Sequence, residues 1–188
     1  MNVIVLVSGG GTNLQALIDK NIPIKLVISS KEGVYAIERA NKAGIPAVII
    51  KNNDELLEKM CEINAELIVL AGYLKILPAE IINAYKERII NIHPALLPSF
   101  GGKGMYGLNV HKAVLDYGCK ISGATVHFVN EGVDTGRIIA QKAIDILPND
   151  TPETLQRRIM EQVEWVILPQ AVWHLIGDVE ASHSQGNS

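Results

Sequence analysis

The sequence predicts an α/β fold, a Rossmann-like and mostly parallel sheet with helices on both faces and an antiparallel extension near the C-terminal end. Short, continuous apolar runs recur along the chain, starting at residues 3–7, and such runs are typical of strands buried on both faces of a parallel sheet. Segments with helical apolar spacing separate these runs, and a glycine-rich turn at residues 8–13 joins the first strand to its helix. This alternation favours parallel strands with right-handed crossovers.

Each element has its own local signal. Further parallel strands are expected at residues 24–28, 47–50, 67–71 and 88–92. Helices are expected directly after the glycine turn, after residues 52–54, and at residues 34–43, 78–85 and 108–117. Alternating apolar and polar residues at 120–129 and 137–146 predict the two antiparallel strands of the extension.

The last helix has a clear start and one internal proline. Thr151 is a good cap and Pro152 suits the first helical position, after which apolar residues recur every three or four positions. Pro169 is expected to kink or break this helix, because it lacks an amide hydrogen. We expect a single domain over residues 1–177 and a frayed, polar C-terminal tail over residues 178–188.

Composition limits the classes of function. The chain has 188 residues, of which 48% are hydrophobic, and a net charge of -3, so it is a globular protein with no basic footprint for nucleic acid. No apolar run is long enough to span a membrane, and the start of the chain does not read as a signal peptide. Two cysteines, Cys61 and Cys119, without metal-type spacing suit the reducing cytoplasm.

The turn Ser8-Gly9-Gly10-Gly11-Thr12-Asn13 is the first candidate binding element. Glycines let backbone amides approach a ligand, and the start of the following helix, capped by Thr12 or Asn13, favours an anion such as phosphate. The alternative is a tight turn without a ligand. The dinucleotide fingerprint is not met, because Leu14 stands where its third glycine would fall.

A second candidate follows the strand at 67–71. The stretch Gly72 to Pro78, which includes Leu74, Lys75, Ile76 and Leu77, is too apolar for an ordinary solvent-exposed loop. It either packs under a helix or lines an apolar ligand site. In open α/β sheets, ligands bind beyond the carboxyl ends of the strands, where this stretch begins.

The residues Asn91-Ile92-His93-Pro94 carry the strongest chemical signal. Positions i and i+2 of a strand share a face, and Pro94 keeps His93 extended, so Asn91 and His93 are expected to point the same way. An amide donor beside an imidazole can stabilise an oxyanion and move a proton. The alternative is a strand-end Asn in a turn and a His satisfied by the backbone.

Other polar residues allow two interpretations. Asp134, in the loop Asn130 to Gly136, is either a turn residue or a carboxylate that orients a histidine. His111 and His127 are interpreted as structural, with His111 either satisfied or solvated. Glu164 follows the apolar Val163, and its position alone predicts a solvated carboxylate.

Taken together, the glycine turn, Leu70 to Leu77, Asn91 to Pro98 and Asp134-Thr135-Gly136 resemble the formyltetrahydrofolate-dependent formyltransferases. Within that family the chain is most similar to the members that formylate phosphoribosylglycinamide in purine synthesis. The resemblance covers nearly the whole chain up to the polar tail.

The resemblance implies transfer of a formyl group from 10-formyltetrahydrofolate to the glycinamide amine of 5'-phosphoribosylglycinamide. It makes Asn91, His93 and Asp134 the catalytic residues. Asn91 and a protonated His93 would stabilise the oxyanion, and His93 would carry the proton. Asp134 would favour the imidazolium and so raise the pKa of His93.

The resemblance also implies the binding residues. By this resemblance, the phosphate is bound by Gly10, Gly11, Thr12 and Asn13, and the glycinamide portion is bound by Glu164. The folate is bound by Leu74, Lys75, Ile76, Leu77, Asn91, Asn130 and Asp134. We expect 10-formyltetrahydrofolate as co-substrate, no metal, only small-molecule partners, no nucleic acid, no membrane, and a monomer or homodimer in the cytoplasm.

Four alternatives stay open. Methionyl-tRNA formyltransferases add a C-terminal domain and need RNA affinity, whereas this chain is acidic and ends early. Formyltetrahydrofolate deformylases carry an extra N-terminal domain, whereas here the first strand begins at residue 3. A nucleotide-binding module would use the glycine turn alone. A zinc hydrolase would use His93, His111 and His127, which lack a recognisable ligand spacing.

Overall fold

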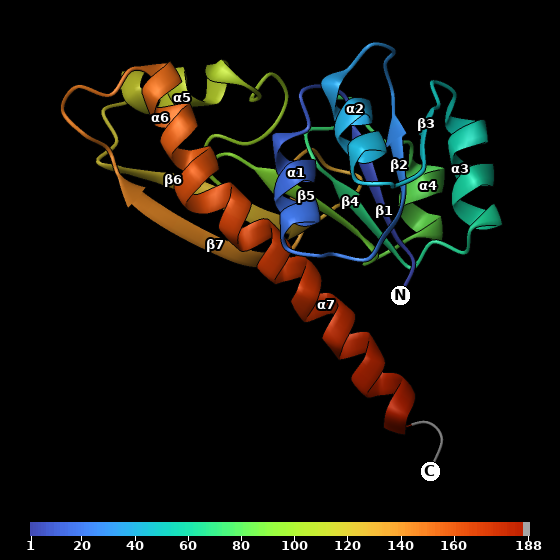
Figure 1. The fold of residues 1–188 in the computed structure, drawn as a ribbon. Coiled ribbons are helices and arrows are strands. Elements are labelled where there is room, and N and C mark those ends of the chain that lie inside the picture. The colour runs from blue at the N-terminus through green and yellow to red at the C-terminus, as the bar shows by residue number, and fades with distance from the viewer. Residues whose placement is uncertain (186–188) are drawn as a thin grey trace.

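A computed structural model describes the backbone of residues 1–185 and the side chains of residues 1–177. A seven-stranded sheet forms its centre (Figure 1). Its strands are β1 (Val3–Val7), β2 (Ile24–Ser29), β3 (Ala47–Ile49), β4 (Leu67–Leu70), β5 (Ile89–His93), β6 (Ile121–Phe128) and β7 (Ile138–Asp145). The helices are α1 (Thr12–Asp19), α2 (Tyr35–Lys42), α3 (Asn53–Glu62), α4 (Ala79–Ala84), α5 (Leu108–Asp116), α6 (Pro152–Ile159) and α7 (Trp165–Gln185).

The predicted fold class is confirmed by the sheet topology. The strand order is β3-β2-β1-β4-β5-β6-β7, with parallel pairing from β3 to β5 and antiparallel pairing of β6 and β7. The order reverses between β1 and β4, which lie side by side although β2 and β3 separate them in the chain. Such a switch point is where open α/β sheets bind their ligands.

Helices cover both faces of the sheet, as Figure 1 shows. The alternation of side chains along β1 divides the core: Val3, Val5 and Val7 pack in one hydrophobic cluster, whereas Ile4 and Leu6 pack in the other. The first cluster includes residues of α1, α2, α5, α6 and α7, and the second includes residues of α3 and α4. Both faces of β1 are therefore buried, which explains its continuous apolar sequence.

Helix starts agree with the sequence at two positions and differ at a third. The Asn52 side chain accepts from the amides of Asp54 and Glu55, and Thr151 forms a capping box with Thr154. The expected cap at the start of α1 is wrong, because Gly11 occupies it with a left-handed backbone and no side-chain cap bond. The side chains after Gly11 are therefore not used in capping.

Pro169, expected to kink or break the last helix, does not break it. Helix α7 continues through Pro169, and a π-helical turn at residues 160–164 precedes it. Pro169 offers no amide hydrogen to the carbonyl of Trp165, but the helix is held by the buried residues Leu168 and Val172.

The C-terminal end also differs from expectation. Residues 178–185, predicted to be a frayed tail, are helical and extend α7 past the sheet (Figure 1). Residues 186–188 of the predicted tail lie outside the described residues. Within the part of the chain that the structure describes, no helix is both long and apolar enough to cross a membrane.

Candidate active site

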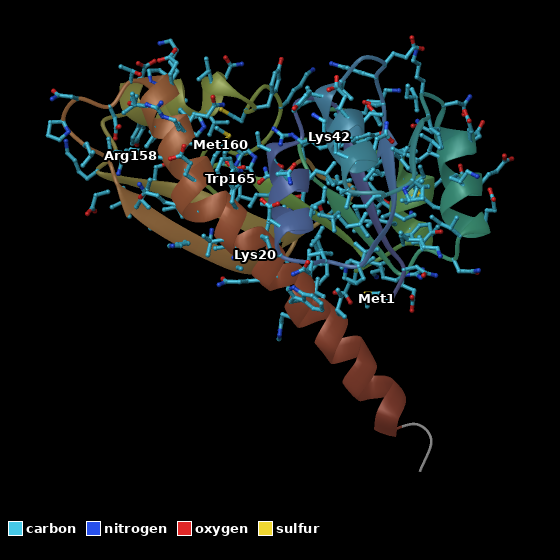
Figure 2. The ribbon with its side chains drawn as sticks, in the orientation of Figure 1. Met1, Lys20, Lys42, Arg158, Met160 and Trp165 are labelled. Carbon is cyan, nitrogen blue, oxygen red and sulfur yellow. The ribbon has the colours of Figure 1, made fainter. Side chains whose placement is uncertain are left out.

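A cavity of about 630 Å³ opens at the carboxyl ends of β1, β4 and β5. Its lining includes Gly10 and Asn13 from the glycine turn, residues 72–77 after β4, and Asn91 and His93 of β5. Further lining comes from residues 129–134 after β6 and from Met160 and Glu164. Met160 is labelled in Figure 2 on the segment that joins α6 to α7. Segments far apart in the sequence thus meet at the switch point of the sheet.

Asn91 is held by a histidine on the neighbouring strand. The antiparallel register places Asn91 opposite His127, and its amide nitrogen lies 3.2 Å from His127 Nε2. His127 Nδ1 lies 2.9 Å from the carbonyl of Phe128 and donates to it, and Nε2 is the ring nitrogen that faces the Asn91 amide. His127, interpreted from sequence as structural, therefore orients a candidate catalytic side chain.

His93 is buried between two oxygen atoms. Its Nε2 donates to the carbonyl of Phe100 at 2.8 Å, and its Nδ1 lies 3.5 Å from Asp134 Oδ2. Burial lowers the pKa of His93 below its ordinary value. The Asp134 carboxylate raises this pKa, as predicted, and so does the Phe100 carbonyl, but burial outweighs both. The resting imidazole is therefore neutral, and its Nδ1 is free to take a proton.

Asp134 lies between two imidazoles. Its Oδ2 accepts from the amide of Gly102 at 3.0 Å, and its Oδ1 lies 3.6 Å from His127 Nε2. Burial alone would raise the pKa of Asp134, but His127, His93 and the Gly102 amide together lower it. The carboxylate is thus kept charged beside His93.

Strained backbone flanks His93 on both sides. Phe100 and Asp134 each have a positive φ, 55° and 57° respectively, a region that a bulky residue such as Phe rarely adopts. These two residues supply the oxygens that face the His93 ring. Strain of this kind concentrates at functional sites, where surrounding contacts hold the backbone in place.

The glycine turn contributes a buried polar pair. Asn13 Nδ2 donates to Glu164 Oε2 at 2.7 Å, and only 6% of Glu164 is exposed, so the interpretation of a solvated carboxylate is wrong. Burial raises the pKa of Glu164, against the lowering effect of the Asn13 bond. Thr12 lies instead at a smaller neighbouring pocket of about 290 Å³, and neither Thr12 nor Gly11 lines the main cavity.

The apolar stretch after β4 lines the cavity, but not uniformly. Leu74 and Ile76 are 56% and 73% exposed, whereas Leu77 is buried in the core. The amide of Leu74 donates to Ser8 Oγ at 3.0 Å, which ties this stretch to the glycine turn. Lys75 donates to the carbonyl of Lys51 at 2.6 Å. Exposed apolar side chains that line a cavity suit the apolar part of a ligand.

Asn130 lines the cavity from the loop that follows β6. Its side-chain oxygen accepts from the Gly132 amide and the Thr135 hydroxyl, at 3.1 and 2.8 Å. These bonds shape the turn that carries Asp134. Every residue predicted for the site except Gly11 and Thr12 therefore lines a single cavity.

His111 was expected to be either satisfied or solvated, and it is neither. The ring is fully buried, it lines the cavity, and no described residue lies within hydrogen-bonding distance of either ring nitrogen. Burial, and to a lesser degree the proximity of His93, lowers its pKa to about 4. Its position three residues before the buried Val114 on α5 was the available sequence signal.

The histidines among the described residues are not arranged as a metal centre. Among the residues that the structure describes, no group of three or more His, Cys, Asp or Glu side chains is placed to hold a metal ion. Instead, His93 and His127 face the same carboxylate. The geometry of a paired acid and base fits this site better than that of a metal centre.

Fold and cavity together define a class of protein. It is an α/β protein with a cavity at the switch point of its sheet, and the cavity is lined by a glycine-rich turn and by Asn91, His93 and Asp134. The formyl transferase family model matches residues 1–172, and the chain belongs to this family.

Relatives and solved structures agree with this membership. The chain is 40% identical to the phosphoribosylglycinamide formyltransferase of Haemophilus influenzae, over 90% of this chain and 84% of that protein. It is 42% identical to the chloroplastic phosphoribosylglycinamide formyltransferase of Arabidopsis thaliana, over 84% of this chain and 60% of that protein. The structure of phosphoribosylglycinamide formyltransferase from Anaplasma phagocytophilum matches with a TM-score of 0.87 and 36% identity, covering 95% of this chain and 88% of that one.

Some relatives are much longer. The chain is 42% identical to the trifunctional purine biosynthetic protein adenosine-3 of Drosophila melanogaster, but it spans only 14% of that protein. It likewise spans about 60% of the plant protein.

Proposed function

We propose that this protein is a phosphoribosylglycinamide formyltransferase. It would transfer the formyl group of 10-formyltetrahydrofolate to the amine of 5'-phosphoribosylglycinamide, giving 5'-phosphoribosyl-N-formylglycinamide and tetrahydrofolate. The observation that carries the proposal is that Asn91, His93 and Asp134 share one cavity with a hydrogen-bonded pair, Asn13 of the glycine turn and Glu164 of the π-helical turn. A formyl donor and a phosphorylated acceptor would each have a place there, with the reacting groups between them.

The chemistry follows from the cluster. The acceptor amine attacks the formyl carbon, a new carbon–nitrogen bond forms, and charge develops on the formyl oxygen. The Asn91 amide has two hydrogens, so it can bond His127 with one and donate to that oxygen with the other. The tetrahedral intermediate then breaks the bond to N10 of the folate.

Proton transfer completes the reaction. The attacking amine loses a proton and the folate nitrogen gains one, so no net proton is consumed. His93 Nδ1 is the unprotonated nitrogen of a neutral ring, and the Asp134 carboxylate 3.5 Å away stabilises the imidazolium once it forms. Burial keeps His93 neutral before the reaction, which makes it a base in the resting enzyme.

The two ends of the cavity suit the two substrates. The start of α1 presents backbone amides at the glycine turn, which favours the phosphate of the acceptor. Glu164, buried beside Asn13, is an acceptor for the polar glycinamide portion. Leu74 and Ile76 offer apolar contact to the folate, and the residues around Asn130 offer backbone groups to its pterin ring. Gly11 and Thr12 would act through their amides.

The test is a formyl-transfer assay on the purified protein, with 10-formyltetrahydrofolate and with or without phosphoribosylglycinamide. Turnover that needs the acceptor, and that falls in His93→Ala, supports the proposal. The exposed His174 on α7 offers a matched control, and His174→Gln should retain full activity. Equal folate consumption without acceptor would point to a hydrolase. No folate turnover by a folded protein would favour a binding module.

We further propose that the protein works in the cytoplasm as a monomer or homodimer. The acidic net charge of -3 and the small-molecule scale of the cavity support small-molecule partners. Sedimentation analysis would separate the two oligomeric states.

A further inference from the structure

We propose that Arg39 is a positioning residue for the acceptor phosphate, acting from α2 through the backbone of the glycine turn. The inference rests on the proposed function, since it assumes that this turn receives the phosphate. Arg39 lines the smaller pocket, together with Thr12, and does not line the main cavity that holds Asn91, His93 and Asp134. Its role would be to fix which way the peptide groups of the turn face.

The guanidinium of Arg39 joins the turn to the helix that follows it. Its Nε donates to the carbonyl of Gly10 at 2.9 Å, and its Nη1 donates to Gln15 Oε1 on α1 at 3.0 Å. Two donors of one rigid, planar group therefore fix two points on either side of the start of α1. The Gly10 carbonyl, thus held, faces the guanidinium.

A second residue of α2 also holds a carbonyl of the turn toward this helix. The amide of Ala36 donates to the carbonyl of Gly9 at 3.2 Å. A Cβ added to Gly11 would lie 2.7 Å from the Ala36 Cβ and 2.8 Å from its Cα, so the two backbones are in close contact. Two consecutive carbonyls of the turn, those of Gly9 and Gly10, are thus engaged by α2.

A phosphate site needs this arrangement. Carbonyl oxygens and phosphate oxygens repel each other, whereas amide hydrogens attract phosphate, so a binding turn must face its carbonyls away from the ligand. Glycine peptides rotate easily, because glycine tolerates both signs of φ. Without Arg39, the Gly10 carbonyl would lose the hydrogen bond that holds it toward α2 and away from the phosphate.

The position of Arg39 on α2 supplies a matched control. Its guanidinium lies 4.8 Å from the centre of the Tyr35 ring, and the Lys42 ammonium lies 5.2 Å from the centre of the same ring. Lys42 bonds the Tyr35 hydroxyl and is labelled in Figure 2. Both residues are cations on α2 beside one aromatic ring, but only Arg39 bonds the glycine turn.

The experiment compares Arg39→Met with Lys42→Met in the transfer assay. Arg39→Met should raise the KM for phosphoribosylglycinamide about tenfold, the effect of losing one charge-assisted hydrogen bond, and leave kcat and the KM for the folate unchanged. The same variant should lose little affinity for the dephosphorylated acceptor, ribosylglycinamide. Lys42→Met should match the wild type for both acceptors.

An unchanged acceptor KM in Arg39→Met would overturn the proposal, and so would an equal loss of affinity for both acceptors. If Arg39→Met fails to fold, Arg39→Lys keeps the charge but cannot hold Gly10 and Gln15 in the same fork. Arg39→Lys should raise the KM for phosphoribosylglycinamide but not the KM for the folate. A wild-type KM for phosphoribosylglycinamide in this variant would show that the charge alone suffices and would contradict the positioning role of Arg39. Failure of the proposed function would appear separately, as absent transfer in the wild type.

Discussion

His93 occupies an environment in which two physical effects oppose each other. Burial penalises the charged imidazole and lowers its pKa, whereas the Asp134 carboxylate favours that charge. Sequence reasoning identified the carboxylate but not the burial, because the latter depends on how the segment around Phe100 covers the ring. The result is an uncharged imidazole beside a charged carboxylate, which would stabilise an imidazolium formed by proton transfer.

The first prediction concerns this counter-ion. Asp134→Asn removes the charge that stabilises the His93 imidazolium, so kcat should fall by about 10²- to 10⁴-fold. Since loss of the carboxylate lowers the pKa of His93 further, the acidic limb of the kcat/KM profile should move to lower pH. Steady-state kinetics between pH 5 and pH 9 measure both effects. An unchanged rate and profile would exclude Asp134 from this role.

The second prediction concerns Glu164. Its pKa is raised by burial, so its ionised form destabilises the fold, and the penalty grows as pH rises above the ordinary carboxyl range. In Glu164→Gln, the new amide can still accept from Asn13 Nδ2, and it can also donate to Asn13 Oδ1, which has no partner among the described residues. The variant should be more stable by roughly 1 kcal/mol at pH 8.

The same variant should bind phosphoribosylglycinamide more weakly, because a carboxylate acceptor is lost. Urea unfolding at pH 5 and pH 8, together with the acceptor KM, tests both parts. A less stable Glu164→Gln protein at pH 8 would contradict the assignment of a destabilising charge.

At the scale of elements, the junction of β1, α1 and α2 shows why the turn is rich in glycine. Gly11 has a φ of 71° and lies against Ala36, so it needs both the left-handed backbone and the missing side chain. Gly9 needs neither, since its φ is not positive and a Cβ added there would meet no atom within 4 Å. One of the three glycines is thus fixed by packing.

The third prediction follows from that difference. Gly11→Ala should destabilise the protein by about 1–3 kcal/mol, because a strained φ and a clash with backbone are combined. It should also weaken acceptor binding, since α1 can no longer start at its present position. Gly9→Ala is the matched control and should change neither property measurably. Equal urea midpoints for the two variants would refute the argument.

At the scale of the whole molecule, the fold class was predictable because local patterns and topology agree. The apolar run of β1, buried on both faces, required a central parallel strand, and the alternation in β6 and β7 required an antiparallel pair. The two-residue spacing of Asn91 and His93 places them on one face of any strand that contains both. These inferences depend only on residues close together in the sequence.

The features that were missed depend on contacts between distant residues. The partnership of Asn91 with His127 arises from a register across 36 positions of sequence, and the Asn13–Glu164 bond spans 151. The passage of α7 through Pro169 depends on core packing that no local rule includes. Burial of His111 likewise depends on the whole fold closing over α5.

The last prediction treats the molecule as a single cooperative unit. His111 has a pKa of about 4 in the folded protein and an ordinary value of 6.5, so the unfolded chain binds more protons between these pH values. Stability from this group is complete above pH 6.5 and is lost as pH falls toward 4. Each pKa unit corresponds to about 1.4 kcal/mol, which makes the loss by pH 5 roughly 2 kcal/mol.

In His111→Phe, which suits a buried site without hydrogen-bond partners among the described residues, this loss should disappear. The lowered pKa of His93 acts in the same direction and remains in the variant, so a smaller pH dependence should persist. Urea midpoints at pH 7 and pH 5 give the comparison, with His174→Gln as the exposed-histidine control. If wild type and His111→Phe lose stability equally on acidification, the acid sensitivity of the fold originates elsewhere, and His111 does not stay uncharged through burial.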